Sequence, residues 1–191
     1  MALPAAAQPA DPSVDIDVVG VDVARVDVAG VDVDVDVFRR TVGHFASGVT
    51  VVTTTAAGVD HAMTASAFTS LSLEPVLVLV CVDKEARFRD AVLESGSWGV
   101  SVLAAGQRRA AEWFAMKGRP LIGQLDRFPH HRGTTGAALL DDAVAWLECR
   151  TTAVHDGGDH DIVVGEVLAA REVDRDGAPL VYHRGRYERL A

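Results

Sequence analysis

The sequence predicts a mainly β domain with a few inserted helices, arranged as an antiparallel β-barrel. Two observations lead to this fold class. Short segments rich in Val and Thr recur from residue 49 to the C-terminus, separated by Gly, Pro and Asp, and such segments are typical of strands. Most successive segments have no helix between them, which favours antiparallel pairing over a doubly wound parallel sheet.

The folded domain is expected to begin at Phe38, where "FRRTVGHFASG" places Phe38, Val42 and Phe45 on one face of a helix. Further helices are expected at 85–96, with Gly96 past its end, and at 106–116. Residues 117–142 contain four Gly and two Pro and predict a long loop, which in a compact domain is usually functional or disordered. The expected strands are 49–55, 61–70, 76–82, 98–103, 143–154, 161–172, 179–185 and 186–190.

Residues 1–37 form a low-complexity acidic segment with eight Asp and one Arg, about −7 of the formal net charge of −9. Val–Asp alternation has the period of a strand, but Asp is a poor strand former and an acidic face repels itself. We therefore expect a disordered tail. An edge strand and a Ca²⁺-binding acidic repeat are the alternatives, although the glycine spacing that such a repeat needs is missing.

Charge and composition exclude several classes of protein. The net charge of −9 argues against general affinity for nucleic acid. No run of 18 apolar residues and no secretory signal can be recognised, so we expect no membrane span. Cys81 and Cys149 lie far apart in apolar segments and are expected to be buried thiols, with a disulfide or a metal pair as the alternative. Buried thiols indicate a reducing compartment, so we expect a cytoplasmic location.

A hydroxyl-rich stretch, "HAMTASAFTSLSLEP" at 61–75, directly precedes the apolar segment "VLVLVCV". Its hydroxyls could satisfy backbone groups at a bend or hold a polar ligand. Lys84 ends the apolar segment and a helix is expected just behind it; together with hydroxyls, a cation and a helix N-terminus can make an anion site. No dinucleotide or P-loop motif is present. The histidines of "HH" and "HDGGDH" lie in loop-like surroundings without zinc spacing, so no metal is expected.

The order and spacing of several segments resemble the flavin reductase family, which has the FMN-binding split-barrel fold of Greek-key type. These segments are "FRRTVGHFASGVTVVTT", "MTASAFTSLSLEPVLVLVCVDK", "WGVSVLAAGQ", "GDHDIVVGEV" and "PLVYHRGRY". The resemblance runs from Phe38 to the C-terminus. It implies a homodimer in which each flavin, FMN or FAD, lies close to both chains.

The resemblance also implies which residues bind the cofactor and which act on it. His160 is expected to position the nicotinamide or the flavin; without the motif it would be read as a solvated loop residue. The chain departs from the family at Glu85 and Ala86, which stand where relatives have phosphate-binding hydroxyls. Arg87 is expected to compensate. The expected flavin-binding residues are Thr64, Ala65, Ser66, Ser70, Cys81, Val82, Asp83, Lys84 and Arg87, with Ser70 and Lys84 nearer the phosphate.

The function implied by the resemblance is reduction of FMN or FAD by NADH or NADPH. The reduced flavin then diffuses to a partner flavin-dependent monooxygenase. The lost phosphate hydroxyls favour an alternative, a flavin-binding carrier or sensor without reductase activity. In a third interpretation the reductase segments are only a scaffold, and the acidic tail docks a basic partner.

Overall fold

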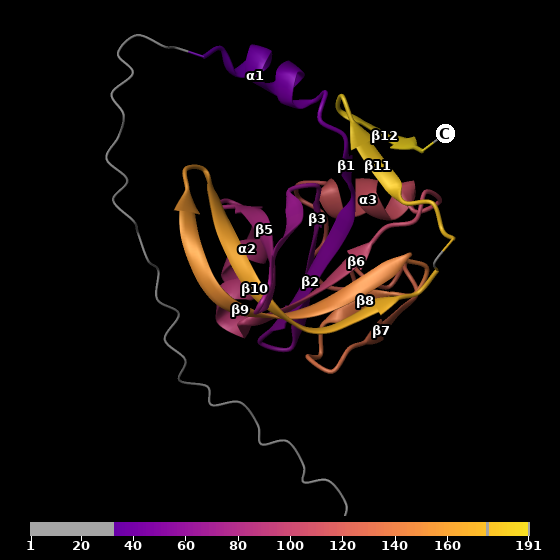
Figure 1. The fold of residues 1–191 in the computed structure, drawn as a ribbon. Helices are drawn as coiled ribbons and strands as arrows, with labels where there is room; N and C mark the ends of the chain where they lie inside the picture. Colours follow the sequence, from indigo (N-terminus) through magenta and orange to yellow (C-terminus); the bar gives the residue numbers. More distant parts are fainter. Residues whose placement is uncertain (1–32, 175, 191) are drawn as a thin grey trace, which may run out of the picture.

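The computed structural model describes residues 33–174 and 176–190. Three helices and twelve strands are found in that part of the chain (Figure 1). The helices are α1 (Val35–Val42), α2 (Arg87–Ser95) and α3 (Arg108–Ala115). The strands are β1 (Ser47–Gly48), β2 (Thr50–Ala56), β3 (Val59–Ala65), β4 (Phe68–Leu73), β5 (Val76–Asp83), β6 (Ser97–Val102), β7 (His130–Arg132), β8 (Ala138–Leu140), β9 (Ala145–Gly157), β10 (His160–Glu172), β11 (Leu180–His183) and β12 (Arg186–Arg189).

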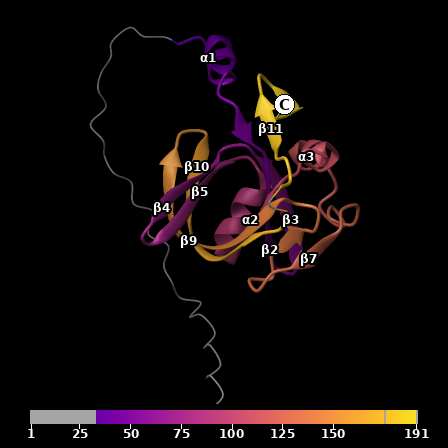
Figure 2. The same ribbon diagram turned by 45° about the vertical axis from the view of Figure 1, so that its right-hand side comes forward.

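The largest sheet of the described residues has seven strands in the order β3-β2-β6-β9-β10-β5-β4, and every neighbouring pair is antiparallel. The prediction of a mainly β antiparallel fold is therefore confirmed. The sheet curves round α2 (Figure 2). Two irregularities in the β9–β10 register, at Val164/Gly165 and Val167/Ala169, bend the two longest strands, since a bulge increases local twist. The pairing does not close the sheet, because β3 and β4 remain its edges.

Strand β2 is covered on both faces of the sheet. Val51 packs into one core cluster with Phe114 of α3, whereas Val52 packs into another with Phe88 and Val92 of α2. Alternate side chains of a strand point to opposite faces. A strand covered by a helix on each face is therefore buried along most of its length, as β2 is.

The 61–70 segment contains a correction to the sequence prediction. A single return strand was expected there, but the chain forms β3, bends at Ser66 and Ala67, and continues as β4. The two halves lie at opposite edges of the seven-stranded sheet. The bend separates them because β3 pairs with β2, whereas β4 pairs with β5.

Most other elements follow the prediction. Helix α2 ends at Gly96, whose φ of 65° is left-handed, as expected for a glycine cap. The 117–142 segment is mostly irregular but contains the short pair β7–β8. Cys81 and Cys149 are free thiols. None of the helices in the described ranges has the length and apolar character needed to cross a membrane.

Helix α1 begins at Val35, before the predicted start at Phe38, and ends at Val42, so that Phe45, which was expected on the helix, lies outside it. Residues 35–37, which were assigned to the acidic tail, form the first turn of α1, and the Asp34 carboxylate caps it by accepting hydrogen bonds from the Asp36 and Val37 amides at 2.9 and 2.8 Å. Residues 1–32 lie outside the described residues, and so do the predictions made for them. Helix α1 buries none of its side chains and projects from the body beside β11 and β12 (Figure 1).

Candidate active site

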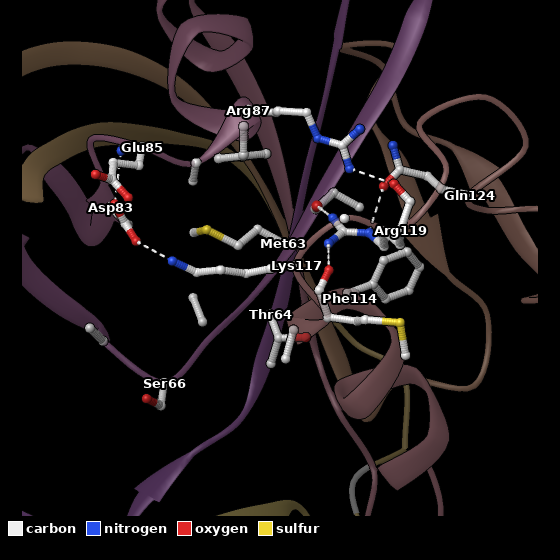
Figure 3. Close-up of a pocket in the computed structure, with 18 of the residues that line it drawn as sticks. Met63, Thr64, Ser66, Asp83, Glu85, Arg87, Phe114, Lys117, Arg119 and Gln124 are labelled. Atoms are coloured by element: carbon white, nitrogen blue, oxygen red, sulfur yellow. Dashed lines mark hydrogen bonds and ion pairs between the residues drawn. The ribbon is translucent and has the colours of Figure 1, made fainter.

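A pocket of about 670 Å³ lies between the bend after β3, the end of β5, the first turn of α2 and the segment that follows α3. The bend brings Ser66 and Ala67 to the pocket, and the start of α2 brings Arg87. Antiparallel pairing sets His160 of β10 opposite Asp83 of β5. The pocket therefore stands where segments far apart in the sequence meet (Figure 3).

Seven of the ten residues expected at the site line this pocket. They are Thr64, Ala65, Ser66, Cys81, Asp83, Arg87 and His160. Two sequence motifs about a hundred residues apart, the hydroxyl-rich stretch and "GDHDIVVGEV", thus meet in one cavity.

The structure does not bring the other three to the pocket. Ser70 is exposed on the edge strand β4. Val82 is fully buried in the α2-side core, because it points to the opposite face of β5 from Cys81 and Asp83. The Lys84 ammonium pairs with the Asp156 carboxylate and lies 3.9 Å from a carboxylate oxygen of Asp161.

The hydroxyls of the 61–75 stretch turn out to be of two kinds. Thr64 donates to the carbonyl oxygen of Ala111 in α3 at 2.7 Å, and Ser72 accepts from the backbone amide of Glu74 at 3.2 Å. Both are structural contacts. Ser66, by contrast, is exposed at the pocket wall and has no hydrogen-bond partner among the described residues. Ser66 is therefore the hydroxyl that remains available to a ligand.

His160 is held by its neighbour in the turn between β9 and β10. Its Nδ1 lies 2.7 Å from a carboxylate oxygen of Asp159, and this hydrogen bond lowers the pKa of Asp159. The side chain of His160 is 43% exposed. Engaging Nδ1 fixes the orientation of the ring and leaves Nε2 as the nitrogen that can meet a ligand.

Three polar residues of the pocket were missed by sequence reasoning: Lys117, Arg119 and Gln124 (Figure 3). Arg119 donates hydrogen bonds to two backbone carbonyls, that of Ala62 and, at 3.0 Å, that of Met116. Its Nε donates to Oε1 of Gln124 at 3.1 Å. Gln124 in turn donates to the Asp60 carbonyl at 2.6 Å. These bonds tie the segment after α3 to the edge strand β3. The "MKGRPLIGQ" run carries no motif, and nothing in it marks Lys117, Arg119 or Gln124 as pocket residues.

Two further contacts cross the pocket to the same segment. Nη2 of Arg87 donates to the backbone carbonyl of Arg119 at 2.7 Å. The Lys117 ammonium lies 3.6 Å from a carboxylate oxygen of Asp83. The first turn of α2 and the end of β5 are thus joined to the segment that follows α3.

The rest of the lining gives the pocket an apolar wall. Met63, Phe114 and Met116 line it, and burial raises the pKa of the Cys81 thiol, which stays neutral near pH 7. In residues 33–174 and 176–190, no three His, Cys, Asp or Glu side chains gather closely enough to hold a metal ion. A partly apolar cavity with a few convergent polar groups is the usual form of a site for an organic cofactor.

Comparison with known proteins agrees with this geometry. The family model described as "Flavin reductase like domain" matches residues 42–191. An NADH-dependent FAD reductase from Streptomyces globisporus is 43% identical over 156 residues, which cover 80% of this chain and 84% of that protein. HsaB, the reductase subunit of a flavin-dependent monooxygenase from Mycobacterium tuberculosis, is 35% identical over 156 residues, covering 81% and 82%.

A solved structure supports the same assignment. BorF, the flavin reductase component of a bacterial two-component tryptophan halogenase, matches with a TM-score of 0.78 and 46% identity over 82% of this chain and 98% of BorF. The resemblance read from the sequence motifs is therefore confirmed in both sequence and fold. The chain belongs to the flavin reductase-like family.

Proposed function

We propose that this protein uses NADH or NADPH to reduce a flavin, FMN or FAD, and releases the reduced flavin to a partner flavin-dependent monooxygenase. The observation that carries the proposal is the meeting of Ser66 and His160 in one pocket of a chain from the flavin reductase-like family. Similar proteins are named as NADH-dependent reductases or as reductase subunits of monooxygenases, which supports both the reaction and the partner.

The pocket fits a flavin in size and in chemistry. Its volume of about 670 Å³ lies within the range of roughly 300 to 1,000 Å³ that is typical of small-molecule sites. The small side chains of Ala65 and Ala67 let a flat ring approach the backbone. Met63, Phe114 and Cys81 offer an apolar wall for its benzenoid edge, and Ser66 offers a hydroxyl for its polar edge.

The residues of the chain bind and orient, while the flavin and the nicotinamide supply the hydride-transfer chemistry itself. Ser66 and the backbone at the bend after β3 hold the flavin. His160, with its ring oriented by Asp159, positions the nicotinamide against the flavin through Nε2. The segment after α3 covers the pocket from the opposite side and excludes water from the reacting pair.

Steady-state oxidation of NADH and NADPH, measured with FMN, with FAD and without added flavin, tests this function. We expect flavin-dependent oxidation of at least one nucleotide, and oxygenation of a substrate when a flavin-dependent monooxygenase is added. Tight flavin binding without nucleotide oxidation would instead establish the carrier or sensor alternative. That alternative is favoured by Glu85 and Ala86, which offer no phosphate-binding hydroxyl at the start of α2.

We further propose that the working form is a cytoplasmic homodimer in which the curved sheet completes a split barrel. Helix α1 supports this assembly, because Phe38 and Phe45, on and just after it, are exposed in the single chain. Leu71 and Leu73 on the edge strand β4 are exposed as well, and a second copy would cover such apolar surface. Light scattering should give twice the chain mass of 20.2 kDa; a monomeric mass at micromolar concentration would contradict the dimer.

A further inference from the structure

One wall of the pocket carries two guanidinium groups that no carboxylate neutralises within the part of the chain that the structure describes. Arg87, at the start of α2, donates to the backbone carbonyl of Arg119. Arg119 donates only to the carbonyl oxygens of Ala62 and Met116 and to the neutral amide of Gln124. Every acceptor of the pair is therefore uncharged.

This arrangement differs from that of other arginines in the structure. Arg89 pairs with Asp161 at 2.7 Å, Arg132 with Asp60 and Arg150 with Glu166, both at 2.5 Å, and Arg108 with Glu112 at 2.7 Å. Burial, and then the positive charge of Arg87, lower the pKa of Arg119. Arg119 is partly buried and Arg87 is exposed. Two cations this close repel each other, and an anion placed between them would relieve that cost.

Lys84, the cation expected from the sequence near the phosphate, is neutralised by carboxylates. Lys84 pairs with Asp156 and also lies near Asp161. The first turn of α2 has no side-chain cap, and Glu85 adds a negative charge to the pocket lining. Figure 3 places Glu85 beside Asp83, on the other side of the pocket from Arg119. The positive side of the pocket is therefore the Arg87–Arg119 wall.

Both guanidinium groups have donors to spare. Arginine carries five N–H donors in a fixed fork. Arg119 uses three of them, one on each nitrogen, and Arg87 uses one. The remaining donors suit a phosphate group, which guanidinium binds through charge-assisted and often bidentate hydrogen bonds.

We propose that Arg87 and Arg119 form the subsite for the phosphate or pyrophosphate group of a nucleotide bound in this pocket. The inference rests on the proposed function, because the ligand would be a flavin nucleotide or a nicotinamide dinucleotide. The resemblance already led us to expect Arg87 near the phosphate; the new element is Arg119, which the sequence did not suggest. Lys84, which was also expected there, lies outside the pocket lining. Lys117 is not part of this wall, because its ammonium lies 3.6 Å from the carboxylate of Asp83 on the other side of the pocket.

Equilibrium binding of riboflavin and FMN separates the phosphate from the ring, since riboflavin lacks the phosphate. Arg87→Gln and Arg119→Gln are compared with Arg150→Gln, which removes the same charge from an exposed ion pair outside the pocket. We expect either pocket variant to weaken FMN binding by about tenfold or more, as for one lost charge-assisted bond. Riboflavin binding should change less than twofold, and Arg150→Gln should change neither. Inorganic pyrophosphate should compete with FMN on the wild-type protein.

A second experiment tests whether the phosphate belongs to the nicotinamide dinucleotide. If the arginines bind the pyrophosphate of NADH, Arg119→Gln should raise the KM for NADH but not that for reduced N-methylnicotinamide, which has no phosphate. Arg119→Lys, which keeps the charge and loses the fork, should give an intermediate effect in whichever arm responds. Either pattern supports the subsite and identifies its ligand.

Two results would overturn the subsite. If Arg119→Gln weakens the binding of riboflavin and FMN equally, or raises the KM of both hydride donors equally, Arg119 only holds the pocket wall against β3. No change in either arm would show that neither guanidinium group contacts the ligand. A protein that binds FMN through these arginines but oxidises no nucleotide would refute the reductase function and leave the subsite standing, so the two failures can be told apart.

Discussion

Ser66 and Thr64 stand two positions apart, yet their hydroxyls have different surroundings. Thr64 bonds to the Ala111 carbonyl, whereas Ser66 is exposed in the pocket. We expect Thr64→Val to lower the free energy of unfolding by about 1 kcal/mol, and Ser66→Ala to weaken flavin binding by about 1 kcal/mol without changing stability. Urea unfolding and flavin titration of both variants test this; loss of flavin affinity with Thr64→Val alone would reverse the assignment.

His160 separates hydride transfer from flavin binding. We expect His160→Ala to leave flavin affinity nearly unchanged and to lower kcat/KM for NADH or NADPH by about 10- to 100-fold, the loss of a positioning group. Asp159→Asn, which weakens the hold on Nδ1, should show a smaller effect in the same direction. A loss beyond about 10⁴-fold would indicate acid–base catalysis, and an unchanged kcat/KM would leave His160 without a role.

Lys84 shows why single residues are harder to predict than motifs. The sequence predicts that Lys84 follows a buried strand. The structure places it directly after β5, but only alternate residues of that strand are buried. The charge of Lys84 is neutralised by Asp156, which lies 72 positions further along the chain. Strand β10 brings the two residues close, because it pairs with both β5 and β9. The pocket roles of Arg119 and Gln124 likewise depend on contacts with β3 that a glycine-rich loop sequence does not reveal.

Secondary-structure elements that depend on local sequence were predicted correctly. The uninterrupted apolar run at 76–82 became β5, and Gly96 ended α2. Strands β7 and β8, only three residues each, were missed inside the 117–142 loop, because "HHR" has no strand pattern. The break between β3 and β4 was missed because alternation continues through Ser66 and only pairing with different partners separates the two halves.

A buried carboxylate holds the turn between β7 and β8 against β9. Glu148 is 2% exposed and accepts hydrogen bonds at 2.7 Å from both the amide and the hydroxyl of Thr135, and at 3.1 Å from the Thr134 hydroxyl. Burial by itself raises the pKa of Glu148, but these hydrogen bonds outweigh it, so the pKa in the folded protein is lowered.

A lowered folded-state pKa means that Glu148 stabilises the fold above its unfolded pKa, and that this contribution is lost as the pH falls through the folded value. We expect Glu148→Gln to be less stable than wild type at pH 7 and to lose less stability on acidification from pH 7 to below 4.5, the ordinary pKa of a glutamate carboxyl. Urea midpoints measured across this range test the prediction. Parallel pH profiles for the two proteins would contradict it.

At the scale of the whole molecule, the acidic N-terminal segment precedes the part of the chain that matches the flavin reductase family. The family match covers residues 42–191, and α1 begins at Val35 with its cap at Asp34. We expect a variant lacking residues 1–32 to keep its melting temperature within a few degrees and its rate of flavin reduction. A variant that also lacks 33–42 serves as the comparison, because it removes α1. A large drop in melting temperature or in the rate of flavin reduction on removing 1–32 alone would show that the acidic segment contributes to the fold or the site.

The central claim is that this pocket brings a nicotinamide and a flavin together for direct hydride transfer. Anaerobic mixing of the flavin-loaded protein with NADH or NADPH, followed by flavin absorbance, tests it most directly. We expect the flavin to bleach in a single turnover, more slowly when the transferred hydrogen is deuterium and more slowly again in His160→Ala. Flavin that stays bound and oxidised in the presence of excess NADH and NADPH would contradict the claim.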